Sequence, residues 1–322
     1  MKQATFMKYI AAAAALMVAG SASAAWPERP ITLVVPWAAG GGTDATARII
    51  GSVLEKELGK PVNVVNHAGG NGVVGYQSIA GSKNDGYTFG MMDTNITALH
   101  HQGLTELSYK DYTPLALVNQ DPEAIIVNAS ASYKDMGDLV KAFTDKPGTF
   151  KASGAGQGSI GHLGVAGLLK SLDLDLDTIH WVPSAGAAPA MIELTADGIQ
   201  IVVATLPEGR SLIDAGKARP LALLADTQSA VYPDVPTLKN AIDSDWTIGL
   251  WRGIVAPKGL PDDIRDKMEA ALKATVNSDA YKEFMAKQGY GVAYMDAASF
   301  GQFMEEQDQS TGELLRAVGL AK

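Results

Sequence analysis

Glycine-rich loops are the part of this sequence with the most evident chemistry. The first lies in residues 31–44, ITLVVPWAAGGGTD, where a loop almost without side chains separates an apolar run from a helical pattern. Such a loop leaves backbone N–H groups open, and the positive end of the following helix dipole adds to their attraction for an anion. We therefore predict a backbone anion site here, with Thr43 or Asp44 as the helix N-cap.

Two glycine loops also match the pattern of dinucleotide-binding loops. Residues 156–161 match G-x-G-x-x-G, and residues 40–45 match its alanine variant. A dinucleotide fold needs a carboxylate at the end of the next strand to hold the ribose. Those strands are expected to end at residues 66–67 (Asn-His) and 182–184 (Val-Pro-Ser), which supply none. We therefore expect no cofactor and interpret the glycines as points where the backbone approaches a ligand.

Ser159 and His162, in the stretch GAGQGSIGH, are the candidates for catalysis. A nucleophile elbow has a glycine two residues before the serine, where this chain has Gln157. An exported hydrolase using Ser159 and His162 is therefore a rival hypothesis, and His162 can instead donate to a ligand or cap a helix. His100 and His101 are adjacent, so they diverge on a helix, and we expect no metal site.

Three further side chains could contribute to a ligand cleft. Trp37 follows the first strand and either forms a wall of the cleft or packs between domains. Arg252 either pairs with a ligand carboxylate or bridges to an acidic residue across a hinge. Asp44, besides capping its helix, can accept a hydrogen bond from a ligand hydroxyl, amine or bridging water. The sequence leaves these alternatives open.

The first 24 residues have the organisation of a secretory signal peptide. Lys2 and Lys8 precede an alanine-rich apolar stretch, and Ala22-Ser23-Ala24 fits a cleavage site. Cleavage near Ala24 changes the net charge from −9 to −11, because both lysines are lost. An acidic exported chain without cysteine is not expected to bind nucleic acid or to use disulfides, a thiol nucleophile or a zinc–thiolate site. We expect a soluble, monomeric protein of the periplasm.

Alternating strand and helix patterns predict an α/β fold with two domains. Residues 31–92 alternate strand, helix, strand, helix and strand, which favours a parallel sheet flanked by helices, and a second alternation covers residues 135–225. Apolar runs at 115–118 and 124–127, split by Asn-Gln-Asp-Pro, are interpreted as the crossing between domains, and the run 246–255 as the return. We predict a signal peptide at 1–24, a first domain at 25–118 plus 246–322, and an inserted second domain at 119–245.

Essentially the whole mature chain resembles the periplasmic substrate-binding proteins of tripartite tricarboxylate transporters, also called Bug receptors. The opening RPITLVVPWAAGGGTD is similar to the family's R-P-I-x-L-[IV]-V-P-x-x-x-G-G-x-x-D, and YPDVPT at residues 232–237 is similar to L-P-D-V-P-T. Further similarities are NHAGG at 66–70, DGYT at 85–88, the segment 147–156 with its PG and SGAG, and VPSAGAAPA at 182–190.

The resemblance implies a two-lobe clamshell of the type II-like periplasmic-binding class, each lobe a mostly parallel sheet flanked by helices, without catalysis. It implies a small carboxylate ligand, a di- or tricarboxylate or an aromatic acid, held by backbone amides from both lobes. The implied partners are the membrane subunits of the transporter. An alternative role is a sensor that presents its ligand to a signalling kinase.

The residues expected to bind this ligand combine the implied loops with nearby side chains. They are Trp37, Ala38, Ala39, Gly40, Gly41, Thr43, Asp44 and Thr94 in the first domain, Ser153, Gly154, Gly156, Ser159, His162, Ser184, Ala185, Gly186 and Ala187 in the second, and Arg252 at the return crossing. One departure matters: many relatives have Tyr-Lys-Gly-Gly where residues 183–186 read Pro-Ser-Ala-Gly. A second ligand charge would therefore need Arg252 as its partner, or the distal group of the ligand is uncharged.

Overall fold

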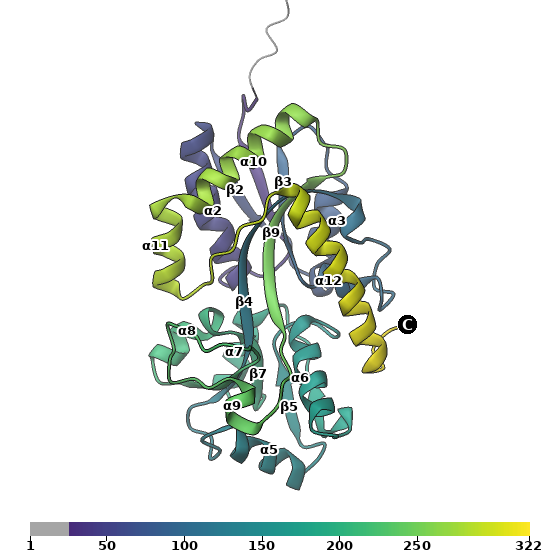
Figure 1. The fold of residues 1–322 in the computed structure, drawn as a ribbon, viewed down its shortest axis with the longest axis vertical. Coiled ribbons are helices and arrows are strands. Elements are labelled where there is room, and N and C mark those ends of the chain that lie inside the picture. Colours follow the sequence, from purple (N-terminus) through teal and green to yellow (C-terminus); the bar gives the residue numbers. More distant parts are fainter. Residues whose placement is uncertain (1–25) are drawn as a thin grey trace, which may run out of the picture.

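The computed structural model describes residues 26–322, and the expected signal peptide lies outside this range. The described chain forms two lobes stacked along the long axis of the molecule, each built on strands flanked by helices (Figure 1). This arrangement confirms the predicted α/β fold with two lobes. The strand order across the whole molecule is β2-β1-β3-β9-β4-β7-β5-β6, with β8 also paired to β4.

The first lobe is built on five strands with helices on both faces. Its strands are β1 (Ile31–Val35), β2 (Val62–Asn66), β3 (Thr88–Asp93) and parts of β4 (Tyr112–Asn128) and β9 (Gly249–Pro257). Helices α2 (Gly42–Leu58), α10 (Asp262–Asn277) and α11 (Asp279–Gln288) pack with Ile31, Leu33 and Val35 on one face. Helices α3 (Val73–Ala80), α4 (Ile96–Leu99) and α12 (Ala297–Ala317) pack with Val34 on the other. Successive residues of β1 therefore face opposite layers, as the strand period requires.

The second lobe repeats this layering around the other end of β4. Its own strands are β5 (Phe150–Ser153), β6 (Ile179–Trp181), β7 (Ile201–Thr205) and β8 (Ala218–Leu223). Its helices are α5 (Met136–Asp145), α6 (Ile160–Ser171), α7 (Ala187–Thr195), α8 (Leu206–Asp214) and α9 (Leu238–Ile242). Short 3-10 turns at Gly70–Gly72, Tyr109–Asp111 and Leu176–Thr178 complete the described elements.

Strand direction follows the chain path. The β1–β2, β1–β3, β5–β6 and β5–β7 pairs are parallel, as expected for strands joined through helices. Every pair that includes β4 or β9 is antiparallel. Because the carboxyl ends of β1 and β3 and of β5 and β7 all point toward the junction of the lobes, their following loops meet there (Figure 1).

The two crossings between the lobes are the long strands β4 and β9, which pair with each other from Tyr112 opposite Pro257 to Pro122 opposite Gly249. The split at residues 119–122, interpreted from the sequence as the crossing between domains, lies inside one continuous strand, because β4 runs from Tyr112 to Asn128. Pro122 is tolerated since pairing with β9 ends there and pairing with β7 begins at Glu123, so no ladder needs its missing N–H. The proposed domain boundaries lie inside β4 and shortly before β9, and they remain a proposal.

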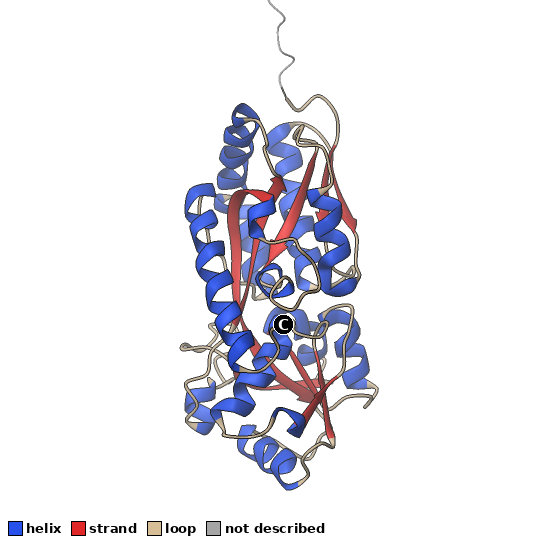
Figure 2. Cartoon of the chain, turned by 90° about the vertical axis from the view of Figure 1, so that its right-hand side faces the viewer, coloured by secondary structure: helices blue, strands red, loops and turns tan. Residues whose placement is uncertain are grey.

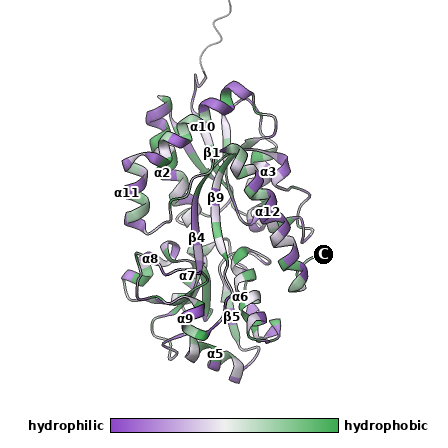
Figure 3. Cartoon of the chain, in the orientation of Figure 1, coloured by the Kyte–Doolittle hydropathy of each residue, from purple (hydrophilic) through white to green (hydrophobic). Residues whose placement is uncertain are grey.

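Helix α12 makes a third link between the lobes. It begins in the first lobe and runs alongside the second (Figures 1 and 2). Leu315 and Val318 pack with Ile160 and Leu163 of α6, and Lys170 Nζ donates to the Ala317 carbonyl at 3.0 Å. Hydrophilic residues lie on the outer surfaces of α10, α11 and α12 (Figure 3), and none of the helices described between residues 26 and 322 is long and apolar enough to cross a membrane.

Candidate functional site

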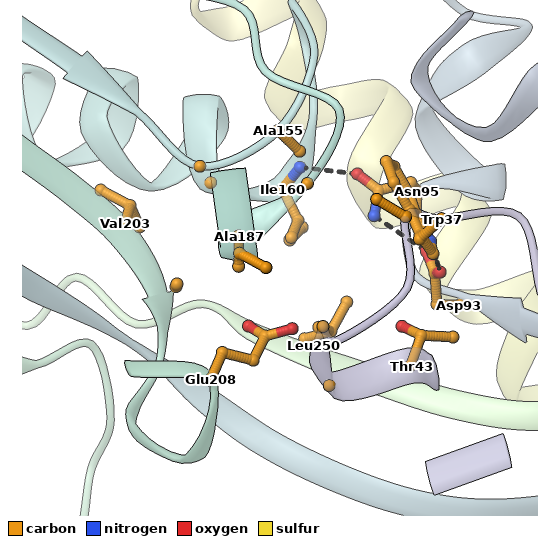
Figure 4. A pocket seen from close by; sticks show the side chains of 18 of the residues that line it. Trp37, Thr43, Asp93, Asn95, Ala155, Ile160, Ala187, Val203, Glu208 and Leu250 are labelled. Carbon is orange, nitrogen blue, oxygen red and sulfur yellow. Dashed lines mark hydrogen bonds between the residues drawn. The ribbon is translucent and has the colours of Figure 1, made fainter. Parts of the chain in front are cut away.

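A cavity lies between the lobes where the glycine loops meet (Figure 4). It encloses about 520 Å³ of space, part of it open to solvent. The first lobe contributes Trp37, Ala38, Gly41, Gly42, Thr43, Asp93 and Asn95, and the crossings contribute Glu123 and Leu250. The second lobe contributes Gly154, Ala155, Ile160, Gly161, Gly186, Ala187, Ala188, Pro189, Val203, Ala204 and Glu208. The wall of this cavity therefore combines residues of both lobes and of the crossings between them.

Direct hydrogen bonds hold the two lobes together beside the cavity. The Ile160 N–H donates to Asn95 Oδ1 at 3.0 Å, and the Gly156 N–H donates to Asn71 Oδ1 at 3.2 Å. Gln102 Nε2 donates to the Gly158 carbonyl at 2.9 Å. The glycine loop at residues 156–161 therefore contacts the first lobe through its backbone, so the structure has its lobes closed on each other.

The N-termini of helices α2, α6 and α7 border the cavity. The caps of α2 and α7 are Gly41 and Gly186, and neither has a side chain to bond the first-turn N–H groups. In α2 the first intrahelical bond runs from Ala45 to Gly41, and in α7 from Ala190 to Gly186, so the N–H groups before them have no helical partner. Ser159 caps α6. Two uncapped helix starts that face one cavity favour an anion there.

Asp44 is not the N-cap of α2, and the prediction that Thr43 or Asp44 would be is wrong. The helix begins at Gly42, and the Asp44 carboxylate turns back to accept from the Gly40 N–H at 3.0 Å. It also accepts from Arg48 and from Asn66 Nδ2 at 3.0 Å. Burial raises the pKa of Asp44, but these hydrogen bonds outweigh it and lower the pKa below its ordinary value. Asp44 thus fixes the loop and does not line the cavity.

Trp37 forms part of the cavity wall and is tied to Asp93. Its ring N–H donates to the Asp93 carboxylate, which also accepts from Tyr76 Oη at 3.0 Å and from the Asn95 backbone and side chain at 3.0 and 2.8 Å. Trp37 is 8% exposed and Asp93 is buried, so the indole is held in one orientation. Both readings of Trp37 made from the sequence, cleft wall and packing aromatic, describe parts of this arrangement.

Replacing Trp37 by phenylalanine tests the hydrogen bond to Asp93. Phenylalanine keeps an aromatic wall but removes the donor, and a buried acceptor that loses a partner costs about 1–3 kcal/mol. We therefore expect Trp37→Phe to lower the free energy of unfolding by this amount in urea denaturation. An unchanged free energy would mean that the three remaining donors satisfy Asp93 fully.

Arg252 lies beneath the cavity in a buried network. Its Nη1 donates to Asp121 Oδ2 at 3.0 Å and to Asn119 Oδ1, and its Nη2 donates to Glu208 Oε1 at 3.0 Å. Its Nε donates to Thr43 Oγ1 at 3.2 Å, so the Thr43 hydroxyl hydrogen is free to point elsewhere. Arg252 is 0% exposed. Arg252 therefore forms the bridge to acidic residues that the sequence left open as the alternative to pairing with a ligand carboxylate.

The titration behaviour of this network follows from its burial. Burial alone lowers the pKa of Arg252, but Glu208 and Asp121 outweigh it and raise the pKa above its ordinary value. Burial raises the pKa of Asp121, with the Arg252 charge and the Gly291 N–H opposing the rise. The guanidinium thus stays charged, and its charge limits the rise in the pKa of Asp121.

The structure brings seven of the expected ligand-binding residues to the cavity wall: Trp37, Ala38, Gly41, Thr43, Gly154, Gly186 and Ala187. The others lie behind the wall or beside it: Ala39, Gly40, Asp44, Thr94, Ser153, Gly156, Ser159, His162, Ser184, Ala185 and Arg252. Several have structural partners that explain this. Thr94 Oγ1 accepts from the Trp251 N–H at 2.8 Å, and Ser184 Oγ donates to the Gly186 carbonyl at 3.0 Å.

Ser159 and His162 do not form a nucleophile–base pair. Ser159 Oγ accepts from the backbone N–H of His162, whereas the His162 ring stacks on Trp181 with centroids 4.9 Å apart. The ring Nδ1 accepts from the Gly158 N–H at 2.9 Å. Burial lowers the pKa of His162 to about 4. The ring is therefore neutral at physiological pH and helps to shape the glycine loop.

Sequence reasoning missed the polar residues Asp93, Asn95, Glu123 and Glu208 in the cavity wall. Asp93 is the last residue of β3 and Asn95 follows it, at the strand edge where ligands bind, so the strand-end rule could have found them. Glu208 belongs to a capping box with Thr205, which identifies a helix start but not what it faces. Glu123 directly follows the polar residues that split β4 and precedes its apolar run 124–127, so the local pattern did not identify it as a buried cavity residue.

The fold and this cavity define a two-lobe solute-binding protein. Residues 46–320 match the family described as tripartite tricarboxylate transporter family receptor, and the chain belongs to this family. Its members are receptors rather than enzymes, which agrees with the arrangement of Ser159 and His162. The chain is also similar to a UPF0065 protein of Bordetella pertussis, 29% identical over 99% of each chain.

Two solved structures from Rhodopseudomonas palustris are similar over nearly the whole chain. One is MatC with bound malate, 25% identical with a TM-score of 0.82, covering 90% of this chain and 100% of MatC. The other is a protein solved with adipate, 25% identical with a TM-score of 0.87, covering 92% of this chain and 99% of that protein. Both bound molecules are small dicarboxylates.

Proposed function

We propose that this protein binds a small organic carboxylate in the cavity between its lobes and delivers it to the membrane subunits of a tripartite tricarboxylate-type transporter. The observation that carries the proposal is the pair of glycine-capped helix starts at Gly41 and Gly186, one from each lobe, on a single cavity. Their unpaired N–H groups suit a carboxylate that touches both lobes. Relatives solved with malate and adipate support the same ligand class.

In the proposed mechanism the ligand stabilises the closed form. Each lobe supplies part of the anion site, so the site is complete only when the lobes meet. A ligand shifts such an equilibrium only by its difference in affinity for the two forms. The closed form would then dock on the transporter. We also propose that the chain acts in the periplasm after cleavage near Ala24, as its leader suggests.

A thermal-shift screen tests the binding proposal. The panel contains succinate, malate, adipate, citrate and benzoate, with the mature chain as the sample. Because a ligand that binds only the folded state stabilises it by mass action, we expect at least one of these acids to raise the melting temperature in proportion to the logarithm of its concentration. If no acid in the panel does so, the ligand class is wrong.

Delivery requires a separate experiment, because a transport receptor and a signalling receptor use the same closed form. Co-purification with the transporter's membrane subunits, in the presence of the acid found by the screen, is expected for the transport role. Co-purification with a sensor-kinase ectodomain instead would assign the chain to signalling.

A further inference from the structure

Glu123 contributes to the cavity wall, and one of its carboxyl oxygens has no partner among the described residues. Its residue is 2% exposed, and its Oε2 is buried without a hydrogen-bond partner among the described residues. Its main chain is fixed on both sides, because its N–H donates to the Ile248 carbonyl at 3.1 Å and its carbonyl accepts from the Leu224 N–H at 2.8 Å. The main chain of Glu123 is therefore held in place beside the cavity.

An unpaired carboxyl group in this position is costly for the protein alone. The following β4 residues Ala124 to Val127 are apolar and buried, so a leucine at position 123 would suit the strand. A buried polar atom without a partner costs about 1–3 kcal/mol, and an ionised carboxylate costs more. Because no protein group repays this cost, we look to a bound ligand for the missing partner.

The acidic groups around Glu123 oppose its ionisation. Glu208 on α8, Asp121 on β4 and Asp93 on β3 all act in this direction, whereas Arg252 on β9 favours the ionised form. Arg252 is already hydrogen-bonded to Asp121 and Glu208 at 3.0 Å each. Burial first, and then Glu208, raises the pKa of Glu123 well above its ordinary range, with Arg252 only partly offsetting the rise.

The rest of the described cavity wall offers no basic side chain. An anionic ligand must therefore be held by donors without charge, which are the helix N–H groups, the Thr43 hydroxyl and any neutral acid. A neutral carboxylic acid is a strong donor to a carboxylate, since hydrogen bonds with one ionised partner are about twice as strong as neutral ones.

We propose that Glu123 enters the cavity as a neutral carboxylic acid and donates its hydrogen to an anionic oxygen of the bound carboxylate, so that ligand affinity depends on pH. This inference rests on the proposed function. It assigns to Glu123 the recognition of the ligand group that a basic residue would otherwise bind. No bond other than hydrogen bonds forms, and the proton stays on Glu123.

The sign of the pH dependence follows directly. Binding needs the protonated form, which is present below the raised pKa of Glu123 and is lost as the pH rises through it. Above that pKa the affinity should fall by up to about tenfold for each pH unit. Because the bound anion stabilises the protonated form of Glu123, ligand binding at a pH near the pKa of Glu123 should take up protons from the buffer.

The experiment is isothermal titration calorimetry of the acid with the largest shift in the thermal screen, from about pH 6 to about pH 9, where its carboxylates are ionised. The proteins are the wild type, Glu123→Gln and Glu123→Leu. Glutamine still donates a hydrogen bond but cannot titrate, so the ligand affinity of Glu123→Gln should not change with pH. It should be weaker than that of wild type near pH 6 and no weaker near pH 9. Leucine removes the donor and should bind at least about tenfold more weakly near pH 6.

Each contrary outcome is distinct. A wild-type affinity without pH dependence, or one that falls equally in Glu123→Gln, overturns the role of Glu123 and leaves the receptor function standing. If the affinity of wild type rises with pH and binding releases protons, Glu123 is instead ionised when the ligand is bound, and the proposal is wrong. If none of the acids binds wild type at any pH, the proposed function itself fails. Thermal unfolding of both variants checks that they are folded.

Discussion

Replacing Arg252 by methionine is expected to lower the free energy of unfolding by about 3–5 kcal/mol. Methionine preserves an unbranched side chain but leaves Asp121 and Glu208 buried without their common cation, since Arg252 donates to each of them at 3.0 Å. Removing one member of a buried ion pair costs this much because the remaining charge stays in a medium of low polarity. Urea denaturation measures the loss directly, and thermal unfolding should show a decrease on the order of 10 °C.

The loss in Arg252→Met should depend on pH. Burial already raises the pKa of Asp121 while Arg252 opposes the rise, so removing the guanidinium should raise that pKa further. The variant is then least stable relative to wild type at neutral pH, and the difference shrinks as the pH falls through the raised pKa and Asp121 takes up a proton.

Arg265→Met is the matched control for Arg252→Met. Arg265 pairs with Asp262 at 2.8 Å and with Asp266 at 2.9 Å, but these carboxylates are exposed on α10. Exposed pairs contribute about 0–1 kcal/mol. If Arg252→Met costs no more than Arg265→Met, the buried network does not hold the two lobes together energetically.

Replacing Gly41 by valine is expected to weaken ligand binding by more than about tenfold, or 1.4 kcal/mol, while leaving the fold intact. Gly41 lines the cavity, and its φ of −83° and ψ of 175° are extended backbone that valine adopts readily. An added Cβ would meet only the Ala38 carbonyl oxygen, at 3.7 Å. The valine side chain should therefore fill space in front of the α2 amides without straining the backbone.

The neighbouring position gives the opposite expectation. A Cβ on Gly42 would lie 2.5 Å from Arg252 Nη2 and 2.7 Å from Glu208 Oε1, so Gly42→Ala should disturb the buried network and lower stability. Calorimetry with the acid from the thermal screen, combined with thermal unfolding, separates the two effects. Unchanged affinity in a folded Gly41→Val protein would remove the α2 loop from the site.

Ala39 tests whether the ligand contacts the whole loop, as expected from the sequence, or only the part of it that lines the cavity. It lies in the same loop as Gly41, but it is exposed and is not part of the cavity wall. Ala39→Val should therefore weaken binding less than Gly41→Val does. An equal or larger effect would show that the ligand contacts the whole loop rather than the start of α2.

Much of the architecture could be predicted because it depends on local patterns. Apolar runs, glycine stops and helix periodicity identify strands and helices whichever partners they find, as at the end of α2, where Gly59 has a φ of 65°. The anion site proposed at the first glycine loop was predicted in the same way, since backbone N–H groups and helix dipoles follow from the element boundary itself. The family motifs added the expectation of a clamshell arrangement and of a small carboxylate ligand.

Side-chain partners across the molecule could not be predicted in this way. Arg252 contacts Asp121, which is 131 residues away, and Glu208, which is 44 residues away, and nothing local selects these acids over others. The sequence position of Asp44 predicted a helix cap, but its carboxylate instead accepts hydrogen bonds from Gly40, Arg48 and Asn66. Continuity of β4 through Pro122 likewise depended on which neighbouring strand was paired on each side.

The sequence alone therefore predicted a leader and determined the alternation of strands and helices and the positions of the glycine loops, because each of these is encoded within a few consecutive residues. Only the tertiary structure decided that the loops of both lobes border one cavity, and that its wall contains carboxyl groups instead of the basic side chain a second ligand charge would need. Burial and the arrangement of charges depend on segments far apart in the chain, and these become neighbours only when it folds.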